Sequence, residues 1–513
     1  MLTETRAERA MPDPANARGR SWWLPAFGAV LGAAVFLLVR DSLTDDGYIS
    51  LAYAKNLAVH GEWGLVPGSP ANSATSPLNV LLLGALTFVT RVAGGPHPVV
   101  ALGVLTVFCG GVLGWAWQRF GRVLTLPPAA GVLGVALVLL NPFVLSAVGL
   151  EVLLIPAVLL VLTVFALEGR PRLFGVAAGL AVLTRLDLVV FVVVIALSTP
   201  AIRRRPWPAA GWAVLTTAPW FAVSWVAFGS FVPDTLVIKQ LQAGVFAPWS
   251  FSTGPLMYYL GWPVTVLVSF LPALLGVIAL AGWAAARFGA RWPDFPALGP
   301  PAALGAGGIL HYLAYSFLGV GPFHWYYVAP VTAAGTFGVA AFGVWYAQAR
   351  QRRALRPGPP VLALGLTGAV LLSGAAVDVA QGVPWPSPVV FGNWASARDY
   401  ASVGTQLGAR LGGASVAGPG EIGTLAYFCD CVILDEFSDR GQAVGLVEKR
   451  IATAGPLMRL ALRINYHWLD RSIPPRRADY RLVYGTGPAT GPDSWQVQSA
   501  AKGVGHFTLS RVP

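Results

Sequence analysis

Long apolar stretches separated by short polar loops make up most of the chain. They cover roughly residues 22–39, 77–92, 97–117, 124–141, 152–167, 173–198, 209–229, 259–285, 299–319, 325–347 and 360–379. Many reach about 18 residues, the length at which an α-helix spans the roughly 30 Å of hydrocarbon in a bilayer. The pattern predicts a polytopic α-helical membrane protein.

The composition supports the same class. The 513 residues have a mean hydropathy of +0.62, and 55% of them are hydrophobic while only 11% are charged. A soluble chain usually carries about a quarter charged residues. The formal net charge of +12 would raise nucleic acid as a partner of a soluble domain. Most Arg residues lie in short loops between apolar stretches, where the positive-inside rule accounts for them, so we expect no nucleic-acid partner.

Short basic loops constrain the topology. They hold Arg119 and Arg122, Arg170 and Arg172, Arg203 to Arg205, Arg287 and Arg291, and Arg350 to Arg356. If these loops are cytoplasmic, residues 1–21 form a cytoplasmic N-terminal tail and 22–39 is an uncleaved first span. A crossing at 77–92 would put the Arg119 loop outside, so we expect that stretch to be a juxtamembrane helix at the outer interface.

The stretch 173–198 has basic loops at both ends and contains Arg185 and Asp187. Charges at membrane depth need a protein-lined or water-filled cavity, where irregular backbone is also tolerated. We expect a hairpin of two half-helices broken around Thr184–Asp187, which keeps both basic loops on one side and gives about eleven spans. The predicted transmembrane domain covers residues 22–384, with outer loops at 41–96, 142–151 and 230–258.

Residues 385–513 have a different composition, because charged residues return and no apolar stretch reaches spanning length. Segments 414–417, 431–434 and 480–484 have the character of strands, and 442–470 that of helix. We expect a small extracytoplasmic α/β domain. Cys429 and Cys431 lie two residues apart in a predicted strand, where a bridge would strain the backbone, so we expect both to be free.

Two adjacent carboxylates, Asp45 and Asp46, follow the first predicted span. Desolvating two charges at the end of a span costs free energy, which favours a functional role for the pair. The ordinary alternative is that both carboxylates form a solvated helix cap. The next residues carry Tyr48 and Lys55 at mixed helical spacing, which favours one wall of a polar site. Asp45 and Asp46 are therefore candidate catalytic residues, and Tyr48 and Lys55 candidate substrate-binding residues.

Glu151 and Lys239 lie on the same predicted outer side. Alone, Glu151 would be an ordinary charge at a helix N-terminus. Near Asp45 and Asp46 it allows carboxylates to divide base, orienting and metal-binding roles. Lys239 either snorkels to the interface or neutralises a lipid phosphate.

The segment His324-Trp325-Tyr326 starts another span at the outer side. Trp and Tyr there usually form an aromatic belt, but a His among them can also contact a metal or a phosphate. Arg185 and Asp187 favour an ion pair that holds the hairpin, and Arg185 is also a candidate substrate contact. No P-loop, GxSxG, HExxH or Rossmann motif is present, so any sugar donor should come from the membrane.

Ten short motifs occur in order along the chain. They are Asp45-Asp46-x-Tyr48, Tyr53-Ala-Lys-Asn-Leu, Thr75-Ser76-Pro77-Leu78, Asn141-Pro142, Gly149-Leu150-Glu151, Leu183-Thr184-Arg185-x-Asp187, Pro233-Asp234-Thr235 with Lys239, Trp325-Tyr326-Tyr327, Asn393-Trp394 to Tyr400, and Gly420-Glu421-Ile422-Gly423. Together they resemble the GT-C glycosyltransferases, most closely the actinobacterial enzymes that add terminal arabinofuranose to cell-wall arabinan. The departures are Lys55 in place of a frequent Arg, Asn72-Ser73-Ala74 in place of Glu-Gly-Tyr, and Leu186 in place of Pro.

The resemblance implies a polyprenyl-phosphate-sugar donor and a cell-wall glycan acceptor at the outer face of the plasma membrane. It implies that Asp45 or Asp46 is the catalytic carboxylate, with Glu151 assisting. Lys239 and His324 would hold the donor phosphate, whose negative charge grows as it leaves. If a divalent cation takes part, its ligands would be Asp46, Glu151 and His324.

Two other functions stay open. A GT-C transferase of another sugar, such as mannose, onto a glycan, lipid or protein would use the same residues. A polyprenyl-lipid transporter should show pseudo-repeated halves with charges at mid-membrane. The charges here gather at the predicted outer interface and no internal repeat is evident, which favours an enzyme.

Overall fold

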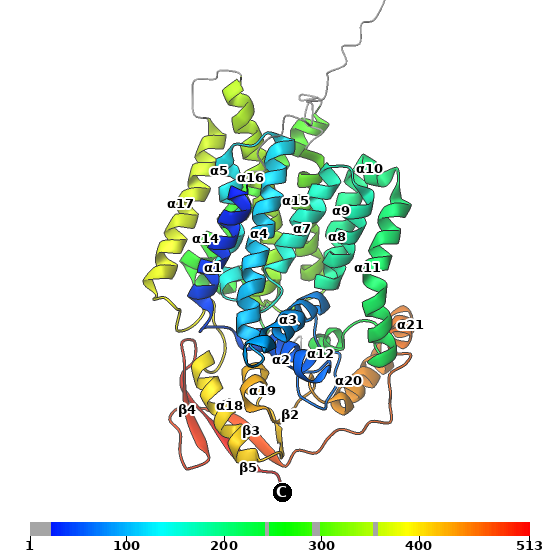
Figure 1. The fold of residues 1–513 in the computed structure, drawn as a ribbon, viewed down its shortest axis with the longest axis vertical. Helices are drawn as coiled ribbons and strands as arrows, with labels where there is room; N and C mark the ends of the chain where they lie inside the picture. The colour runs from blue at the N-terminus through cyan, green and yellow to red at the C-terminus, as the bar shows by residue number, and fades with distance from the viewer. Residues whose placement is uncertain (1–21, 242–245, 290–297, 352–357) are drawn as a thin grey trace, which may run out of the picture.

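The computed structural model is a helical bundle with a small sheet domain at one end (Figure 1). It describes residues 22–241, 246–289, 298–351 and 358–513. The predicted cytoplasmic tail, residues 1–21, lies outside this range. The end of the bundle next to the sheet domain is called the domain end here, and the opposite end the far end.

Apolar helices make up the bundle. They are α1 (Trp23–Val39), α4 (Pro98–Leu124), α5 (Pro128–Leu139), α7 (Leu154–Leu167), α8 (Pro171–Thr184), α9 (Val189–Ser198), α11 (Pro206–Ala227), α14 (Pro263–Phe288), α15 (Gly299–Phe317), α16 (Val328–Gln351) and α17 (Pro359–Ala380). Within the described ranges, α4, α14, α17 and the continuous segment His324–Gln351 are long and apolar enough to cross a membrane. This is the architecture of a multi-pass membrane protein, as the sequence predicts.

Short elements connect these helices. They are α2 (Asp45–His60), α3 (Pro77–Thr90), η2 (Arg91–Ala93), α6 (Pro142–Leu145), η3 (Leu186–Leu188), α10 (Pro200–Arg203), α12 (Thr235–Leu241), α13 (Gly254–Gly261) and η6 (His324–Tyr327). With 14 residues, α3 is shorter than the about 20 residues that a span needs. It packs beside α2 near the domain end (Figure 1), as expected for a juxtamembrane helix.

Close helix packing centres on α16 and α4. In the most apolar window of each helix, 83% of the residues are buried in the His324–Gln351 segment but only 28% in α17. The helix α16 is thus central and α17 peripheral. Small residues bring α1 against α4, because a Cβ on Gly28 would lie 2.1 Å from the carbonyl oxygen of Gly110. Such glycine contacts are typical of helix pairs in membranes.

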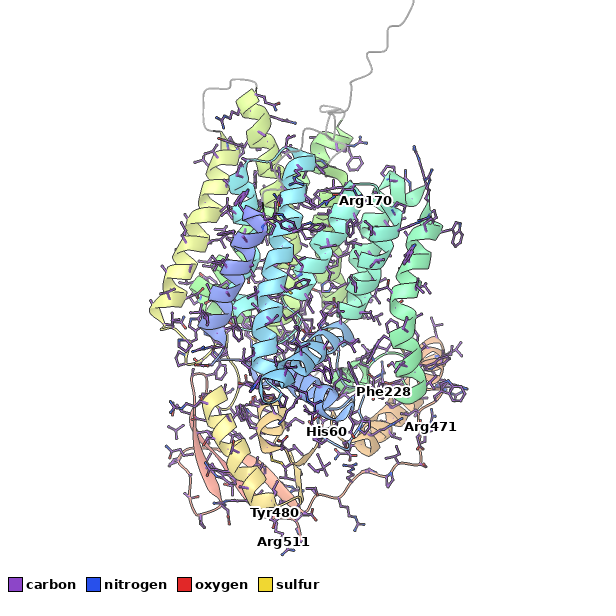
Figure 2. All side chains as sticks on the ribbon, in the orientation of Figure 1. His60, Arg170, Phe228, Arg471, Tyr480 and Arg511 are labelled. Atoms are coloured by element: carbon purple, nitrogen blue, oxygen red, sulfur yellow. A yellow bond between two sulfur atoms is a disulfide. The ribbon has the colours of Figure 1, made fainter. Side chains whose placement is uncertain are left out.

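The predicted break inside 173–198 is confirmed. The helix α8 ends at Thr184, η3 follows, and α9 returns beside α8 to the far end (Figure 1). The basic loops that follow α4 and α7 also meet at the far end, where Glu168 pairs with Arg119 and lies 3.1 Å from the Nε atom of Arg170. Figure 2 shows Arg170 at the far end, with His60 and Phe228 near the domain end.

The sheet domain contains α18 (Ala397–Leu411), β1 (Ser415–Ala417), α19 (Gly423–Cys429), β2 (Val432–Leu434), α20 (Arg440–Thr453), α21 (Pro456–Asn465), β3 (Tyr480–Thr486), β4 (Ser494–Ser499) and β5 (Gly503–Arg511). The strand order is β2-β1-β3-β5-β4, with β1 parallel to β2 and β3, and β5 antiparallel to β3 and β4. Its core side chains Tyr400, Ile433 and Phe507 belong to one buried cluster with Tyr53 of α2 and Trp63. The domain is therefore packed directly onto α2.

The expectation of two free cysteines in this domain is wrong. Cys429 and Cys431 form a disulfide, with their Cα atoms 5.0 Å apart. The expectation assumed that both residues lie in one strand, but α19 ends at Cys429 and Asp430 has a φ of +49°. This left-handed residue turns the chain between the two cysteines, so the extended geometry that would separate the sulfur atoms is not present.

Candidate functional site

The first turn of α2 directs its two carboxylates to different regions. Asp45 is 5% exposed, and its carboxylate accepts hydrogen bonds from the backbone N–H groups of Gly423 (3.0 Å) and Thr424 (2.7 Å). These N–H groups open α19 in the sheet domain, so they and the helix dipole favour a negative charge there. Asp45 therefore fastens the start of α2 to the sheet domain.

A second carboxylate, Glu421, lies beside Asp45. It accepts hydrogen bonds from the backbone N–H of Trp394 (3.0 Å) and from the hydroxyl of Tyr400. Burial raises the pKa of Glu421 to about 7, and the negative charge of Asp45 adds to the effect. Burial also raises the pKa of Asp45 to about 6, against the lowering effect of its two N–H donors.

We call this region the domain junction: Asp45, Tyr400, Glu421, Gly423 and Thr424. A further bond crosses it, from the Thr44 hydroxyl to the side-chain oxygen of Asn393 at 2.9 Å. Neutral N–H and O–H donors bind both carboxylates. The domain junction thus holds α2 in place through hydrogen bonds from neutral groups.

Asp46 belongs to the other region. Burial raises its pKa, the negative charge of Glu151 raises it further, and the positive charge of Lys239 lowers it. The three side chains are therefore close enough to interact electrostatically. Three of the residues selected from the sequence, which are far apart along the chain, are brought together at the domain end.

Glycines allow this approach. A Cβ on Gly47 would lie 3.3 Å from the carbonyl oxygen of Val148, and a Cβ on Gly149 would lie 3.0 Å from the Cα of Gly47. Gly149 also has a φ of +112°, which side chains disfavour. The start of α2 can therefore lie directly against the loop before α7, and that loop contains Glu151.

Glu151 is buried and paired with Arg185, whose Nη1 atom lies 2.6 Å from its Oε1. Arg185 also binds Asp187 through Nε at 3.0 Å, and its Nη2 donates to the Tyr315 hydroxyl at 2.9 Å. Asp187 in turn lies 3.0 Å from the Nε2 atom of His311. The predicted Arg185–Asp187 ion pair is present, and it extends into a network between the helix break, α15 and Glu151.

Lys239 approaches this network from α12. Its Nζ atom donates to the hydroxyl of Tyr326 at 3.2 Å and lies 4.9 Å above the ring of Phe323. The guanidinium of Arg185 lies 5.0 Å from the ring of Tyr326, so this Tyr contacts both cations. We call the region the charged cluster; its members are Asp46, Glu151, Arg185, Asp187, Lys239, His311, Tyr315 and Tyr326.

His324 and Trp325 lie at an aromatic edge of the site. The His324 ring is 5.9 Å from Phe143, 6.3 Å from Tyr258 and 4.9 Å from Trp325. Its Nε2 atom is buried and has no hydrogen-bond partner among the described residues. Trp325 stacks on Phe323, the ring under Lys239, at 4.7 Å. The stacked rings of Phe323 and Trp325 thus pack beside Lys239.

Tyr48 and Lys55 lie away from the charged cluster. The ring of Tyr48 packs on Tyr427, with centroids 5.3 Å apart. The Nζ atom of Lys55 is 2.7 Å from the carboxylate of Asp430 and donates to the Tyr427 carbonyl. Both side chains fix α2 to α19. The helical periodicity explains this, because at about 100° per residue both positions lie roughly 180–200° from Asp46.

The metal ligands expected from the resemblance, Asp46, Glu151 and His324, stay a prediction. Within the described ranges, no group of three or more His, Cys, Asp or Glu side chains is placed to hold a metal ion. Arg185 already neutralises Glu151, and aromatic rings surround His324. These residues do not fit a metal site as they stand, so we assign no step to a metal.

Several functional partners were not selected from the sequence. His311 and Tyr315 are polar residues inside an apolar helix, a signal of function or pairing in membranes. Gly423 and Thr424 bind Asp45 through their backbone N–H groups, so the residue types do not reveal this role. Only the Gly420-to-Gly423 motif marks their place, because a Cβ on Gly423 would lie 2.1 Å from the carbonyl oxygen of Asp45.

Comparison with known proteins gives one line of support. No protein-family model and no curated protein sequence matches the chain. Among solved structures, the chain is similar to the crystal structure of ArnT from Cupriavidus metallidurans bound to undecaprenyl phosphate. The TM-score is 0.51 at 14% sequence identity, and the match covers 95% of this chain and 98% of that chain. The chain therefore has an ArnT-like GT-C fold with a small C-terminal sheet domain.

Proposed function

We propose that this protein is a membrane glycosyltransferase that moves a sugar from a polyprenyl phosphate donor to an acceptor hydroxyl. The observation that carries the proposal is the charged cluster, in which Asp46 and Glu151 lie with Lys239 and Arg185. It is built at the domain end of an ArnT-like fold, and the similar ArnT structure holds undecaprenyl phosphate. Carboxylates beside cations suit a reaction that takes up a proton and releases a phosphate.

Asp46 is the candidate base. Its carboxylate is not tied to the backbone of the sheet domain as that of Asp45 is. Its raised pKa brings it nearer to the operating pH, where a general base is most effective. It would take the proton of the acceptor hydroxyl as the hydroxyl oxygen bonds to the anomeric carbon. Glu151, already bound by Arg185, would orient the acceptor.

Lys239 is the candidate contact for the leaving phosphate. The bond between the anomeric carbon and the phosphate oxygen breaks, and its electron pair leaves with the polyprenyl phosphate. Lys239 donates to a neutral Tyr326 hydroxyl, whereas Arg185 is engaged by two carboxylates. Lys239 can therefore redirect its charge to a phosphate at little cost, while Arg185 stays with its partners.

The sugar and the acceptor are proposed from the ordered sequence motifs. They favour arabinofuranose as the sugar and a cell-wall glycan as the acceptor. The positive-inside rule places the far end, with its basic loops, in the cytoplasm. The charged cluster and the sheet domain would then face the outside of the plasma membrane, which is where a cell-wall acceptor is found.

The test is sugar transfer by the purified protein. Polyprenyl-phospho-arabinofuranose is supplied with an arabinan oligosaccharide, and wild type is compared with Asp45→Asn and Asp46→Asn. As a matched control we choose Asp41→Asn, because Asp41 lies in the same loop but is exposed. Product from wild type and the control, with none from folded Asp46→Asn, would support both the enzyme and its sugar.

Other outcomes separate the alternatives. Consumption of a mannosyl donor in place of the arabinosyl donor would keep the transferase and discard arabinose. If no donor is consumed but the reconstituted protein moves a polyprenyl lipid between leaflets, the transferase proposal is wrong and the protein is a transporter.

A further inference from the structure

An amphipathic segment of the sheet domain exposes a row of large apolar side chains. Leu457 is 83% exposed, Leu460 57% and Ile464 58%, all in α21, and Trp468 just after the helix is 55% exposed. Leu457, Leu460 and Ile464 are spaced by three and four residues, so they share one face of the helix. Arg459 lies towards the opposite face, about 130° from the centre of the apolar face, and Arg463 about 90° from that centre.

Water is a poor environment for this face. Removing large apolar side chains from water is favourable, and contiguous exposed apolar patches usually mark a binding surface. A helix with an apolar face, a terminal Trp and basic residues at its sides is typical of helices that lie in a membrane interface. The chemistry of the face therefore fits a lipid surface.

The position of α21 agrees with this partner. It lies beside the domain end of α11 (Figure 1). The indole N–H of Trp225 in α11 donates to the Ile464 carbonyl at 3.1 Å, and its ring packs on Trp468 with centroids 6.5 Å apart. The N–H of Val232 donates to the side chain of Asn465 at 2.7 Å. The segment is thus fixed to the domain end of α11, a helix of the bundle.

The same helix α11 exposes large apolar side chains on the outside of the bundle. They are Trp207, Trp212, Val214, Leu215, Val223 and Val226. Since Trp225 joins α11 to α21, the apolar face of α21 continues this surface at the membrane edge. A protein partner would have to cover these exposed residues of α11 as well, whereas a bilayer around the bundle covers both surfaces at once, which makes a bilayer the better occupant.

We propose that α21 and Trp468 lie in the membrane, at the boundary between headgroups and acyl chains of the leaflet at the domain end. Leu457, Leu460 and Ile464 enter the acyl region, and Arg463 reaches the headgroup phosphates. Anionic lipids strengthen this contact through the basic side chain. The sheet domain is therefore attached to the membrane at two places, at the domain junction and through this helix.

The attachment also bears on Lys239, a consequence that rests on the proposed function. The inner side of α21 packs with α20 on Val237 of α12; this buried cluster contains Val237, Val444, Val447, Ile451, Ala454, Leu462, Tyr466 and Leu469. Lys239 follows Val237 by two residues and binds Tyr326. A helix seated in the leaflet thus holds the candidate phosphate contact at the level where the phosphate of a lipid donor lies.

The test uses the full-length protein in lipid nanodiscs containing phosphatidylglycerol. Nitroxide labels are placed at Leu460→Cys and Ile464→Cys, with Arg459→Cys as the control on the opposite face. The native cysteines do not interfere, because Cys109 is buried and the other two form a disulfide. We expect the first two labels to be more accessible to oxygen than to a water-soluble nickel chelate, and the Arg459 label to show the reverse.

Two results would overturn the inference. Equal nickel accessibility at all three positions would mean that the apolar face lies in water. Shielding of Leu460 and Ile464 from both reagents would mean that protein, such as a second copy of the chain, covers the face. Neither result depends on catalysis.

A second measurement tests the link to Lys239. The double variant Leu460→Glu with Ile464→Glu should raise KM for a polyprenyl-phosphate donor by roughly three- to tenfold and change kcat less than twofold, as expected for lost donor binding. An unchanged KM would refute the link while leaving the labelling result intact. A wild type that transfers no sugar would refute the proposed function instead.

Discussion

The domain junction and the charged cluster lie on either side of the first turn of α2, and each holds one of two adjacent carboxylates. At the junction, Asp45 is bound by two N–H groups from a domain nearly 380 residues later in the chain. In the cluster, the charges of Lys239 and Glu151 act on Asp46, lowering and raising its pKa respectively, while burial raises it. This difference is the reason that we propose Asp46 as the reactive carboxylate and Asp45 as a positioning residue.

The two regions also satisfy their charges differently. Hydrogen bonds from neutral groups hold the junction, so Asp45 and Glu421 have pKa values raised to about 6 and about 7. Cations hold the cluster, where Arg185 and Lys239 lie among the carboxylates and Tyr326. Only the second arrangement can receive an anion, because an incoming phosphate needs a cation that can turn towards it.

The largest expected effect separates Asp46 from Asp45. Loss of a general base costs typically about 10²–10⁴-fold in rate, so Asp46→Asn should lose at least about 100-fold in sugar transfer with little change in Tm. Asp45→Asn should lose roughly tenfold and also unfold at lower temperature, since one buried N–H is left unpaired at about 1–3 kcal/mol. Initial rates and thermal unfolding of both variants check this.

If Asp45→Asn abolishes transfer at unchanged Tm while Asp46→Asn stays active, the two roles are exchanged. The assay with Asp41→Asn controls for loss of charge near the start of α2, because Asp41 is exposed.

The second prediction concerns Arg185. Its removal in Arg185→Met leaves Glu151 and Asp187 without their shared cation, and an uncompensated buried charge costs about 3–5 kcal/mol. Lys55→Met is the matched control, since Lys55 pairs with the largely exposed carboxylate of Asp430, and exposed pairs contribute about 0–1 kcal/mol. Thermal unfolding should show a large fall in Tm for Arg185→Met and almost none for the control.

Equal shifts in Tm for the two variants would show that Arg185 in the charged cluster contributes no more to stability than Lys55 does in its pair with Asp430. The contrast between the two regions would then lose its electrostatic basis.

The third prediction breaks the domain junction. In Gly423→Ala the new Cβ would lie 2.1 Å from the carbonyl oxygen of Asp45, so α19 must move away from α2. Overpacking of this kind costs about 1–3 kcal/mol, and transfer should fall with stability because Asp45 loses its donors. Gly445→Ala is the control, since Gly445 lies in α20 and a Cβ added there would meet nothing within 4 Å.

The control should be slightly stabilised, because Ala is favoured over Gly inside helices by about 1 kcal/mol. Unchanged Tm and transfer in Gly423→Ala would mean that the contact between α2 and α19 does not position Asp45.

The features that the sequence could predict are those with a large local free-energy cost. The break after Thr184 was predictable because Arg185 and Asp187 cannot lie in hydrocarbon without partners. The short length and early proline of α3 likewise excluded a full span. Glu151, Lys239 and Asp46 could be selected because unpaired charges at a membrane interface demand a reason.

The features that could not be predicted depend on backbone groups and on one dihedral angle. The donors to Asp45 are N–H groups, which every residue except proline carries. The disulfide follows from a left-handed Asp430, a conformation that the sequence does not specify. Helical periodicity by itself places Tyr48 and Lys55 opposite Asp46. The expectation that all three residues line one side of a polar site does not follow from that periodicity.

The smallest expected effect is the pH dependence that the domain junction gives to stability. Burial raises the pKa of Glu421 from 4.5 to about 7 and that of Asp45 from 3.8 to about 6. The folded state therefore holds more protons than the unfolded state between about pH 4 and 7. These groups stabilise the protein fully at the acidic end of this window, and the stabilisation is lost as the pH rises through about 7.

Glu421→Gln removes one of these groups while its side-chain oxygen can still accept from Trp394 and Tyr400. We expect a flatter dependence of Tm on pH than in wild type, with Tm at pH 8 raised by roughly 1 °C, the shift that about 1 kcal/mol gives in a chain of about 500 residues. Glu448→Gln is the control, because Glu448 is exposed and pairs with Arg471. If Tm depends on pH as steeply in Glu421→Gln as in wild type, Glu421 is ionised in the folded protein at no cost in stability. The domain junction would then stabilise ionised carboxylates as well as the charged cluster does.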